Sequence, residues 1–296
     1  MLTVSNYHYI RNDFTAKYPS IFGITPEYFE NQLIELSKTG SFVSINDLAK
    51  DIHKIVDSEE NRILITFDDG LKEQFVYAIP ILDKHNIPAV FFINSINHIE
   101  KRVSLVHQIH LVRSVVSSKE LYQNLMDYTN KTLNQEEKQN AIEFYRFDDQ
   151  LTAELKYFLN VILDLATQEK FIRPLFLEYF NEQEVIENLY MSETEIINLS
   201  ERGYIGSHTH THLPLGIYDE KIIQFELETT KNFLENLTGQ IINTVAYPYG
   251  TKEAATQIVG NIANKVGYKL GFTTNKATNT KEADLLLLSR FDCNDL

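Results

Sequence analysis

The chain has 296 residues, of which 43% are hydrophobic and 23% charged, so its composition is that of an ordinary folded protein. It carries 27 Lys and Arg against 41 Asp and Glu, and the net charge of -14 argues against binding to nucleic acid or to an anionic membrane. The single cysteine, Cys293, excludes an internal disulfide and a cysteine-rich zinc site.

The N-terminal residues 1–11 have neither the basic start nor the apolar stretch of a signal peptide. Nowhere does an apolar run approach the ~20 residues that cross a bilayer. Because a single cysteine also suits a reducing compartment, we expect a cytoplasmic protein without a transmembrane segment. The oligomeric state is left open by these features.

Six short runs rich in β-forming residues alternate with amphipathic stretches of helical spacing. This alternation predicts an α/β fold with a mostly parallel sheet. Ile63–Ile65 and Val90–Ile93 are continuously apolar, as expected of strands buried on both faces. In such folds functional residues collect where the strands end. The predicted strands are Leu2–Tyr7, Arg62–Phe67, Ala89–Ile93, Gly203–Ser207, Asn243–Tyr247 and Tyr268–Thr273.

Several helices between these strands have clear start signals. The dipeptide Thr25–Pro26 offers an N-cap and a first-turn proline, and Ser192 with Glu195 forms a capping box. A further helix is predicted over Asp219–Gly239. Pro80 should kink or split the helix in which it lies, because proline lacks the N–H that a helix interior needs.

The stretch from about residue 97 to residue 191 breaks this rhythm, because it shows helical patterns without a clear strand. We interpret it as a mainly helical insertion within one domain that spans residues 1–296. The insertion has either a structural role or that of a lid or wall for a substrate site.

The first polar cluster, Thr66–Gly70, places two adjacent carboxylates, Asp68 and Asp69, where a buried strand ends. Neighbouring strand residues point to opposite faces, so these two share a site only if the chain turns there, and Gly70 supplies such a turn. Two close carboxylates also need a compensating cation or hydrogen bonds. The alternative interpretation is an ordinary Asp-Asp-Gly turn that caps a helix.

The second cluster, Gly206–His212, has three histidines within five residues at the end of another predicted strand. One helical turn after that strand would bring His208 and His212 to the same side, at the spacing that paired zinc ligands use. His210 should then point away from both. The alternative is a solvated polar loop.

Three further strand ends carry aromatic or charged residues. The rings of Tyr247 and Tyr249 could form one wall of a sugar-sized pocket, and an ordinary aromatic turn is the alternative. His8 follows the first predicted strand. Arg290 follows an apolar run near the C-terminus, where a surface salt bridge is the alternative.

The aspartates and histidines together predict a divalent metal held by two histidines and one aspartate, with positions left for water and substrate. That arrangement is typical of a catalytic zinc site. The second aspartate would then serve as a base for water.

This combination resembles the polysaccharide deacetylase family, also called the NodB-homology family or carbohydrate esterase family 4. The resemblance depends on Thr66–Gly70 and on the two histidines of the second cluster, with support from Pro80–Asn94 and Tyr247–Gly250. It covers roughly Met1–Asn97 and Tyr190–Leu296. It implies a distorted (β/α) barrel that hydrolyses the N-acetyl group of an amino sugar.

The resemblance also implies roles for single residues. Asp68 would be the general base, and the backbone N–H of Tyr249, with Tyr247 nearby, would face the oxyanion and the substrate. The metal would be zinc, with cobalt, nickel or manganese as alternatives. Its three ligands would be Asp69, His208 and His212.

The chain departs from the family pattern in three places. Ala246 stands where the third motif usually has arginine, the chain has no tryptophan for the Asp-x-x-Asp-Trp motif, and it lacks a C-terminal Leu-x-His. Val4–His8 instead resembles the circularly permuted poly-β-1,6-N-acetylglucosamine deacetylases, whose histidine-bearing strand comes first. We therefore expect His8 to be the general acid, and Arg290 to replace the missing arginine and orient Asp68.

The leading hypothesis is a metal-dependent N-deacetylase of surface-polysaccharide synthesis. Its substrate would be an N-acetylated sugar that is nucleotide-linked, lipid-linked or part of an oligosaccharide. One alternative is hydrolysis of a small non-sugar amide on the same barrel. The other is a catalytically inactive barrel that binds carbohydrate, which the missing arginine favours and the intact aspartates and histidines oppose.

Overall fold

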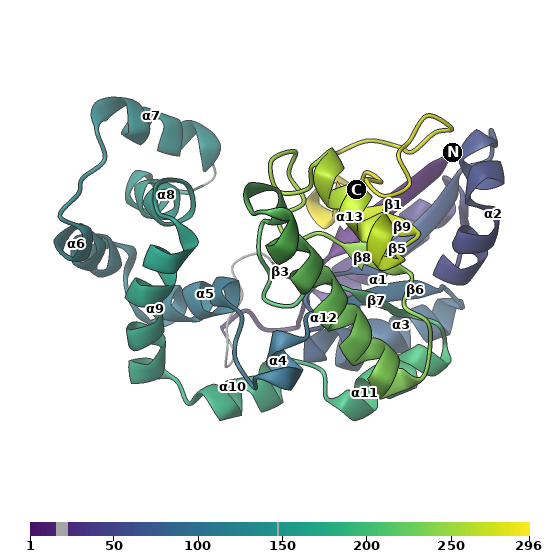
Figure 1. The fold of residues 1–296 in the computed structure, drawn as a ribbon, viewed down its shortest axis with the longest axis horizontal. Helices are drawn as coiled ribbons and strands as arrows, with labels where there is room; N and C mark the ends of the chain where they lie inside the picture. Colours follow the sequence, from purple (N-terminus) through teal and green to yellow (C-terminus); the bar gives the residue numbers. More distant parts are fainter. Residues whose placement is uncertain (16–22, 147) are drawn as a thin grey trace. The chain divides into compact units, whose positions relative to one another are not determined.

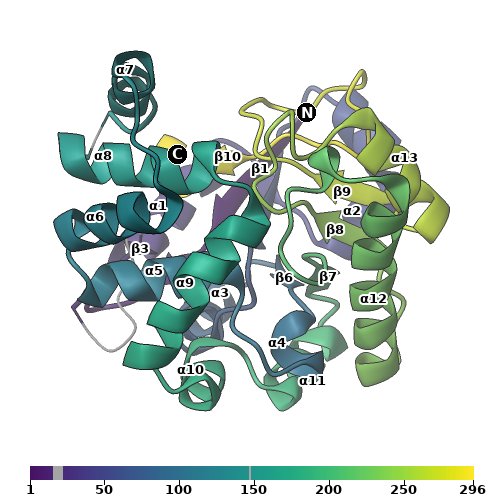
Figure 2. The ribbon, with the colours of Figure 1, turned by 60° about the vertical axis from the view of Figure 1, so that its left-hand side comes forward.

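The computed structural model describes residues 1–15, 23–146 and 148–296, and the chain divides into two compact units. The first unit contains residues 1–14, 23–102 and 185–296, and the second is formed mainly by residues 103–184 (Figure 1; Figure 2). All the candidate site residues belong to the first unit.

The first unit is built on a parallel sheet with the strand order β10-β1-β5-β6-β7-β8-β9, and the short β4 pairs with β5. Every strand pair in this sheet is parallel, as the sequence predicts. A separate small ribbon joins β2 to β3. The strands are β1 (Leu2–Tyr7), β2 (Tyr9–Ile10), β3 (Gly23–Ile24), β4 (Ser41–Phe42), β5 (Arg62–Phe67), β6 (Ala89–Ile93), β7 (Ile205–Ser207), β8 (Thr244–Ala246), β9 (Leu270–Phe272) and β10 (Phe291–Asp292).

The C-terminal segment bridges the two sides of the sheet. Leu288 pairs with Phe272 of β9, and three residues later Phe291 of β10 pairs with Ser5 of β1. The backbone N–H of Thr273 donates to the carbonyl oxygen of Leu288 at 2.8 Å. Because one segment contacts both β9 and β1, the sheet curls, and the expected distorted (β/α) barrel is confirmed.

Alternate residues of the strands face two different apolar clusters. Ile63, Ile65 and Phe67 of β5 pack toward helices on the outside of the curl. The intervening Leu64 packs with Phe92 of β6 and with residues of the other strands on the inside, where α2 adds its apolar face. α12 packs against α11, α13 and β7 (Figure 1).

The helices of the first unit are α1 (Pro26–Ser37), α2 (Ile45–Asp57), the π-helical η1 (Gln74–Ala78), α3 (Ile79–His85), α4 (Ile96–Ile99), α11 (Glu193–Glu201), the 3-10 turn η3 (Leu215–Ile217), α12 (Glu220–Thr238), α13 (Gln257–Val266) and the 3-10 turn η4 (Cys293–Asp295).

The predicted helix signals lie where helices begin and end. Ser192 and Glu195 form the expected capping box, Asp219 accepts the N–H of the first turn of α12, and Gly239 ends that helix with a φ of 66°. The expected break at Pro80 takes the form of the π-helical turn that precedes it. Proline cannot donate to the carbonyl four residues back, and a wider turn accommodates that loss.

The described residues of the second unit contain helices and no strand, and its main range, 103–184, lies within the expected insertion. α5 packs on α9, and α7 packs on α8. The single-domain organisation stays a prediction. The helices of the second unit are α5 (Leu105–Val115), α6 (Ser118–Thr129), α7 (Gln135–Phe144), α8 (Gln150–Tyr157), the π-helical η2 (Phe158–Ile162) and α9 (Leu165–Tyr179). The last helix, α10 (Glu182–Leu189), begins in this unit and ends in the first.

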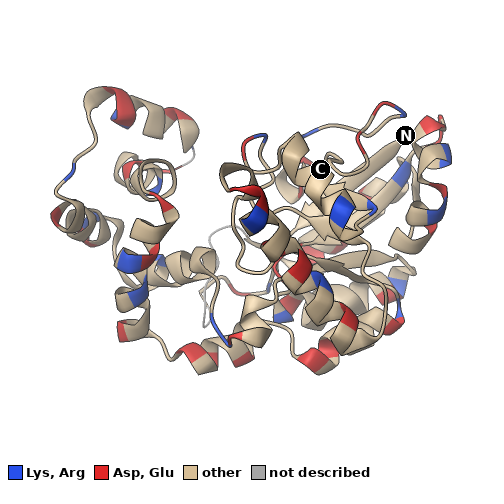
Figure 3. Ribbon diagram, viewed as in Figure 1, with Lys and Arg blue, Asp and Glu red and all other residues tan. Residues whose placement is uncertain are grey.

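Charged residues of both signs are spread over the helices of each unit (Figure 3). Among the described residues, none of the helices combines the length and the apolar character that a membrane crossing requires.

Candidate metal centre and active site

The inside of the curled sheet changes from apolar to polar toward the carboxyl ends of its strands. Val4 and Leu64 belong to the apolar inner cluster. Two residues further along the same strands, Asn6 and Thr66 accept hydrogen bonds from the guanidinium of Arg290, at 3.1 and 3.2 Å. Because side chains alternate along a strand, this polar layer faces the same interior space.

The chain turns sharply after β5, at the Asp68–Asp69 pair. Asp69 and Gly70 have φ values of 75° and 61°. This left-handed turn redirects Asp69, so that both carboxylates reach one site although they are neighbours in sequence. A Cβ at Gly70 would lie 2.8 Å from Cδ1 of Ile93, which explains the glycine.

Asp69, His208 and His212 converge, as the sequence predicts for metal ligands. One potential ligand atom from each lies within 4.8 Å of the others. Nε2 of His208 is 3.4 Å from Oδ1 of Asp69, and Nε2 of His212 is 3.3 Å from the same oxygen. All three side chains are at least nine-tenths buried.

The surroundings of His208 suit a bound cation. Nδ1 of His208 lies 2.8 Å from the carbonyl oxygen of Ala246, which can only accept, so Nδ1 carries the proton. In the neutral ring Nε2 then presents a lone pair to the carboxylate of Asp69. Burial lowers the pKa of His208, but the charges of Asp68 and Asp69 outweigh it and raise that pKa. Two nitrogens and one oxygen around a place that favours positive charge fit a divalent ion such as zinc.

The two histidines meet through an irregular turn rather than the helical turn that we expected. Thr209 and His212 have φ values of 63° and 62°, and the rings of His208 and His212 lie 5.1 Å apart. The helical prediction was wrong because left-handed residues also bring positions i and i+4 together. His210 lies apart from the ligands, with Nδ1 2.8 Å from Oγ of Ser95.

Arg290 lies against Asp68, as expected of a residue that replaces the motif arginine. Nη1 and Nη2 donate to Oδ1 and Oδ2 of Asp68, each at 2.8 Å. Nε of Arg290 donates to the carbonyl oxygen of Thr273 at 2.9 Å. Burial raises the pKa of Asp68, but the charge and hydrogen bonds of Arg290, with His208, hold it below the usual range. Asp68 is therefore an ionised, fixed carboxylate beside the proposed metal ligands.

The other predicted site residues differ in where they lie. Nε2 of His8 is 3.9 Å from Oδ2 of Asp68, and its side chain is 36% exposed. Tyr249 is 42% exposed, and its ring lies 5.3 Å from that of His212. Tyr247 is fully buried in the outer core, so the structure does not present it to a substrate.

Gln74 is a site residue that the sequence did not single out. Its Nε2 donates to the carbonyl oxygens of His8 and Asp68, at 2.9 and 2.6 Å, and its side chain is fully buried. It thereby ties the loop of the proposed acid to that of the proposed base. The sequence signal that could have identified Gln74 is its position as a polar residue on the apolar side of the helix that follows Gly70.

Backbone strain gathers in the same loops. Of the seven non-glycine residues with positive φ in the described part of the chain, four lie there, namely Asp69, Thr209, His212 and Tyr249. Such conformations persist only where the surroundings enforce them, and they cluster at functional sites.

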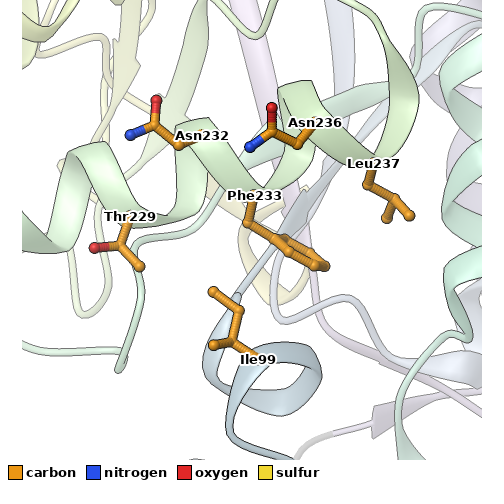
Figure 4. A pocket seen from close by; sticks show the side chains of 6 residues that line it. All are labelled: Ile99, Thr229, Asn232, Phe233, Asn236 and Leu237. Carbon is orange, nitrogen blue, oxygen red and sulfur yellow. The ribbon is translucent and has the colours of Figure 1, made fainter.

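A surface groove of the described part of the chain lies away from these residues. It has a volume of about 590 Å³ and is formed mainly by α12, where Phe233 faces Ile99 of α4 (Figure 4). None of the residues discussed above lines it, so we place the chemistry at the strand ends. Its lining residues are Ile99, Thr229, Asn232, Phe233, Asn236 and Leu237.

Known structures share this fold over almost the whole chain. The Streptococcus pyogenes deacetylase PplD in complex with acetate is 18% identical, with a TM-score of 0.54 over 98% of this chain and 91% of that one. IcaB from Ammonifex degensii is 18% identical, with a TM-score of 0.56 over 98% and 90%. The BpsB deacetylase domain from Bordetella bronchiseptica is 15% identical, with a TM-score of 0.53 over 98% and 95%.

A comparison with curated protein sequences gave no match. The sequence model of the family described as polysaccharide deacetylase matches residues 56–145 and 175–271, which is more than half of the chain. These ranges include the strand ends that carry the two aspartates and the histidine pair. The chain therefore belongs to the polysaccharide deacetylase family and has the curled parallel sheet of its NodB-type barrel.

Proposed function

We propose that the protein is a metal-dependent N-deacetylase that hydrolyses the N-acetyl group of an amino sugar to acetate and a free amine. The observation that carries this proposal is the convergence of Asp69, His208 and His212 beside Asp68. Membership of the polysaccharide deacetylase family supports the same reaction.

Asp69, His208 and His212 would hold the ion, which we propose to be zinc, with cobalt, nickel or manganese as alternatives. When bound, the ion would polarise the amide carbonyl and acidify water. Three protein ligands leave positions for water and substrate, as in other catalytic zinc sites.

The surroundings of Asp68 support its proposed role as the general base. Arg290 keeps its carboxylate ionised and fixes its plane through two parallel hydrogen bonds. Each oxygen retains a second lone pair that can accept the proton of the attacking water. Because the carboxylate is already oriented, little reorganisation is needed during the reaction.

His8 and Tyr249 complete the proposed site. His8 lies beside Asp68 but is more exposed, which lets it reach the leaving amine and donate a proton to it. The backbone N–H of Tyr249 would stabilise the oxyanion, and the left-handed turn at this residue supports a specific orientation of that group.

Replacing His8 with glutamine is expected to lower kcat by about 10²–10⁴-fold with a smaller change in KM, because glutamine keeps polar contacts but cannot transfer the proton. Initial rates of acetate release, measured over a range of substrate concentrations, give both constants. The matched control is His85→Gln, since His85 is also partly exposed but contacts Glu30 instead of the site. A near-wild-type kcat in the His8 variant would remove this residue from its assigned role.

We further propose that the substrate is a nucleotide-linked, lipid-linked or oligosaccharide intermediate of surface-polysaccharide synthesis, and that the protein acts in the cytoplasm. This setting is supported by the cysteine content: the single thiol, Cys293, is buried and can form no internal disulfide, as suits a reducing compartment.

A screen of acetate release tests the proposed reaction. The purified protein is loaded with zinc or cobalt and incubated with free, nucleotide-linked and lipid-linked N-acetyl sugars, with N-acetylated oligosaccharides and with small cyclic amides. Acetate from an N-acetyl sugar is the expected result. Hydrolysis of cyclic amides alone would indicate a different amidase, and sugar binding without hydrolysis would indicate an inactive barrel.

A further inference from the structure

The turn over residues 208–212 carries two of the three proposed metal ligands in a strained conformation. Two of its residues, Thr209 and His212, are left-handed without being glycine. A turn of this kind keeps its shape only if neighbouring groups hold it. The groups that hold the turn therefore determine whether His208 and His212 stay directed at one ion.

One side of the turn is held by the loop that follows β6. The side-chain amide of Asn94 donates to the carbonyl oxygen of His208 and, at 3.3 Å, to that of Thr209. The backbone N–H of Ile96 donates to the carbonyl oxygen of His210 at 3.1 Å. These contacts fix the first half of the turn, next to His208.

The other side is held by Glu226 of α12. Its carboxylate is 2% exposed, and it accepts the backbone N–H of Thr211 at 2.7 Å and the hydroxyl of the same residue at 2.5 Å. Glu226 lies in the stripe of α12 that faces the core, between Ile223 and Thr230. A carboxylate is costly to bury unless hydrogen bonds compensate, and both of these bonds go to the residue just before His212.

We propose that Glu226 is a positioning residue for the metal site: by clamping Thr211 it holds His212 in the orientation that shares an ion with His208 and Asp69. This inference depends on the proposed function, because it assumes that these three residues bind a metal. Groups that hydrogen-bond a metal ligand directly typically contribute about 10–100-fold to metal affinity, and we expect Glu226, which acts through the residue next to a ligand, to fall within that range.

Metal titration of the purified apo-protein tests the proposal. The dissociation constant for zinc is measured by competition with a chelating dye, and the visible absorption of the cobalt(II) form reports the ligand geometry. Glu226→Ala is expected to bind zinc about 10–100-fold more weakly and to alter the cobalt spectrum. The matched control is Glu228→Ala, because Glu228 lies on the same helix and accepts a hydrogen bond from Gln224 of that helix instead of from the turn.

Two milder variants separate positioning from general destabilisation. Thr211→Val removes one donor, and Glu226→Gln keeps an acceptor for the backbone N–H, so both should weaken zinc binding less than Glu226→Ala. Adding Thr211→Val to Glu226→Ala should cause no further loss, because both changes remove the same contact.

Wild-type zinc affinity and an unchanged cobalt spectrum in folded Glu226→Ala would overturn the inference. If Glu226→Ala does not fold, Thr211→Val becomes the deciding variant. Wild-type zinc affinity in Thr211→Val would then overturn the inference. A wild-type protein that binds neither metal would contradict the proposed function itself, and this result is distinct from a loss seen only in the variants.

Discussion

Replacement of Asp68 by asparagine is expected to lower kcat for acetate release by about 10²–10⁴-fold, because the amide keeps the size of the side chain but cannot accept the proton of water. Zinc affinity should stay within a few-fold of the wild type, since Asp68 is not one of the three converging ligands. Steady-state kinetics and a zinc titration on the same preparation measure the two effects.

Asp219→Asn is the matched control for this substitution. Asp219 caps α12 through the N–H of Ile222, and asparagine caps a helix about as well as aspartate does. Activity should therefore be retained. If Asp68→Asn keeps most of the wild-type kcat, Asp68 is not the base, and if it loses the metal instead, the division of roles between the two aspartates is wrong.

Replacement of Arg290 by methionine has the second large effect that we expect. It leaves the buried carboxylate of Asp68 without its paired cation, so the free energy of unfolding should fall by about 3–5 kcal/mol. Loss of the fixed carboxylate orientation should also lower kcat by roughly 10²-fold. Urea denaturation and kinetics measure these effects.

Combined variants distinguish the loss of the Asp68–Arg290 ion pair from a general packing defect. The double variant Asp68→Asn, Arg290→Met should be more stable than Arg290→Met alone, because it no longer contains the unpaired buried charge. Arg290→Lys should fall between wild type and Arg290→Met, since lysine cannot form the two parallel bonds. Arg202→Met is the control: Arg202 pairs with Asp83 in solvent, where such pairs contribute little. Wild-type stability and kcat in Arg290→Met would contradict the role given to Arg290.

The bounds of three strands could be predicted to the residue, and those of the other strands of this sheet could not. β1, β5 and β6 have the predicted bounds: β5 and β6 contain continuous apolar runs buried on both faces, and five of the six residues of β1 are buried. β7, β8 and β9 are shorter than expected, since the β-forming residues Tyr204, Tyr247 and Tyr268 lie in the adjoining loops. β10 is only two residues long and is defined by its pairing with β1, which lies far away in the sequence.

The same distinction applies to the site. The side chains that carry chemistry were identified by their types and spacing at strand ends. Their supports, Gln74 and Glu226, lie in helices and act through contacts that no local pattern specifies. The burial of Tyr247 could have been predicted, because strand alternation puts its side chain on the same face as that of Val245, toward the outer helices.

The account as a whole depends on one ion shared by Asp69, His208 and His212. The most direct measurement is an anomalous difference map from crystals grown with zinc, with data collected on both sides of the zinc absorption edge. We predict a single strong peak about 2.0–2.2 Å from Nε2 of both histidines and from a carboxylate oxygen of Asp69. A map without a peak between these three side chains, at a zinc concentration that saturates other sites, would contradict the account.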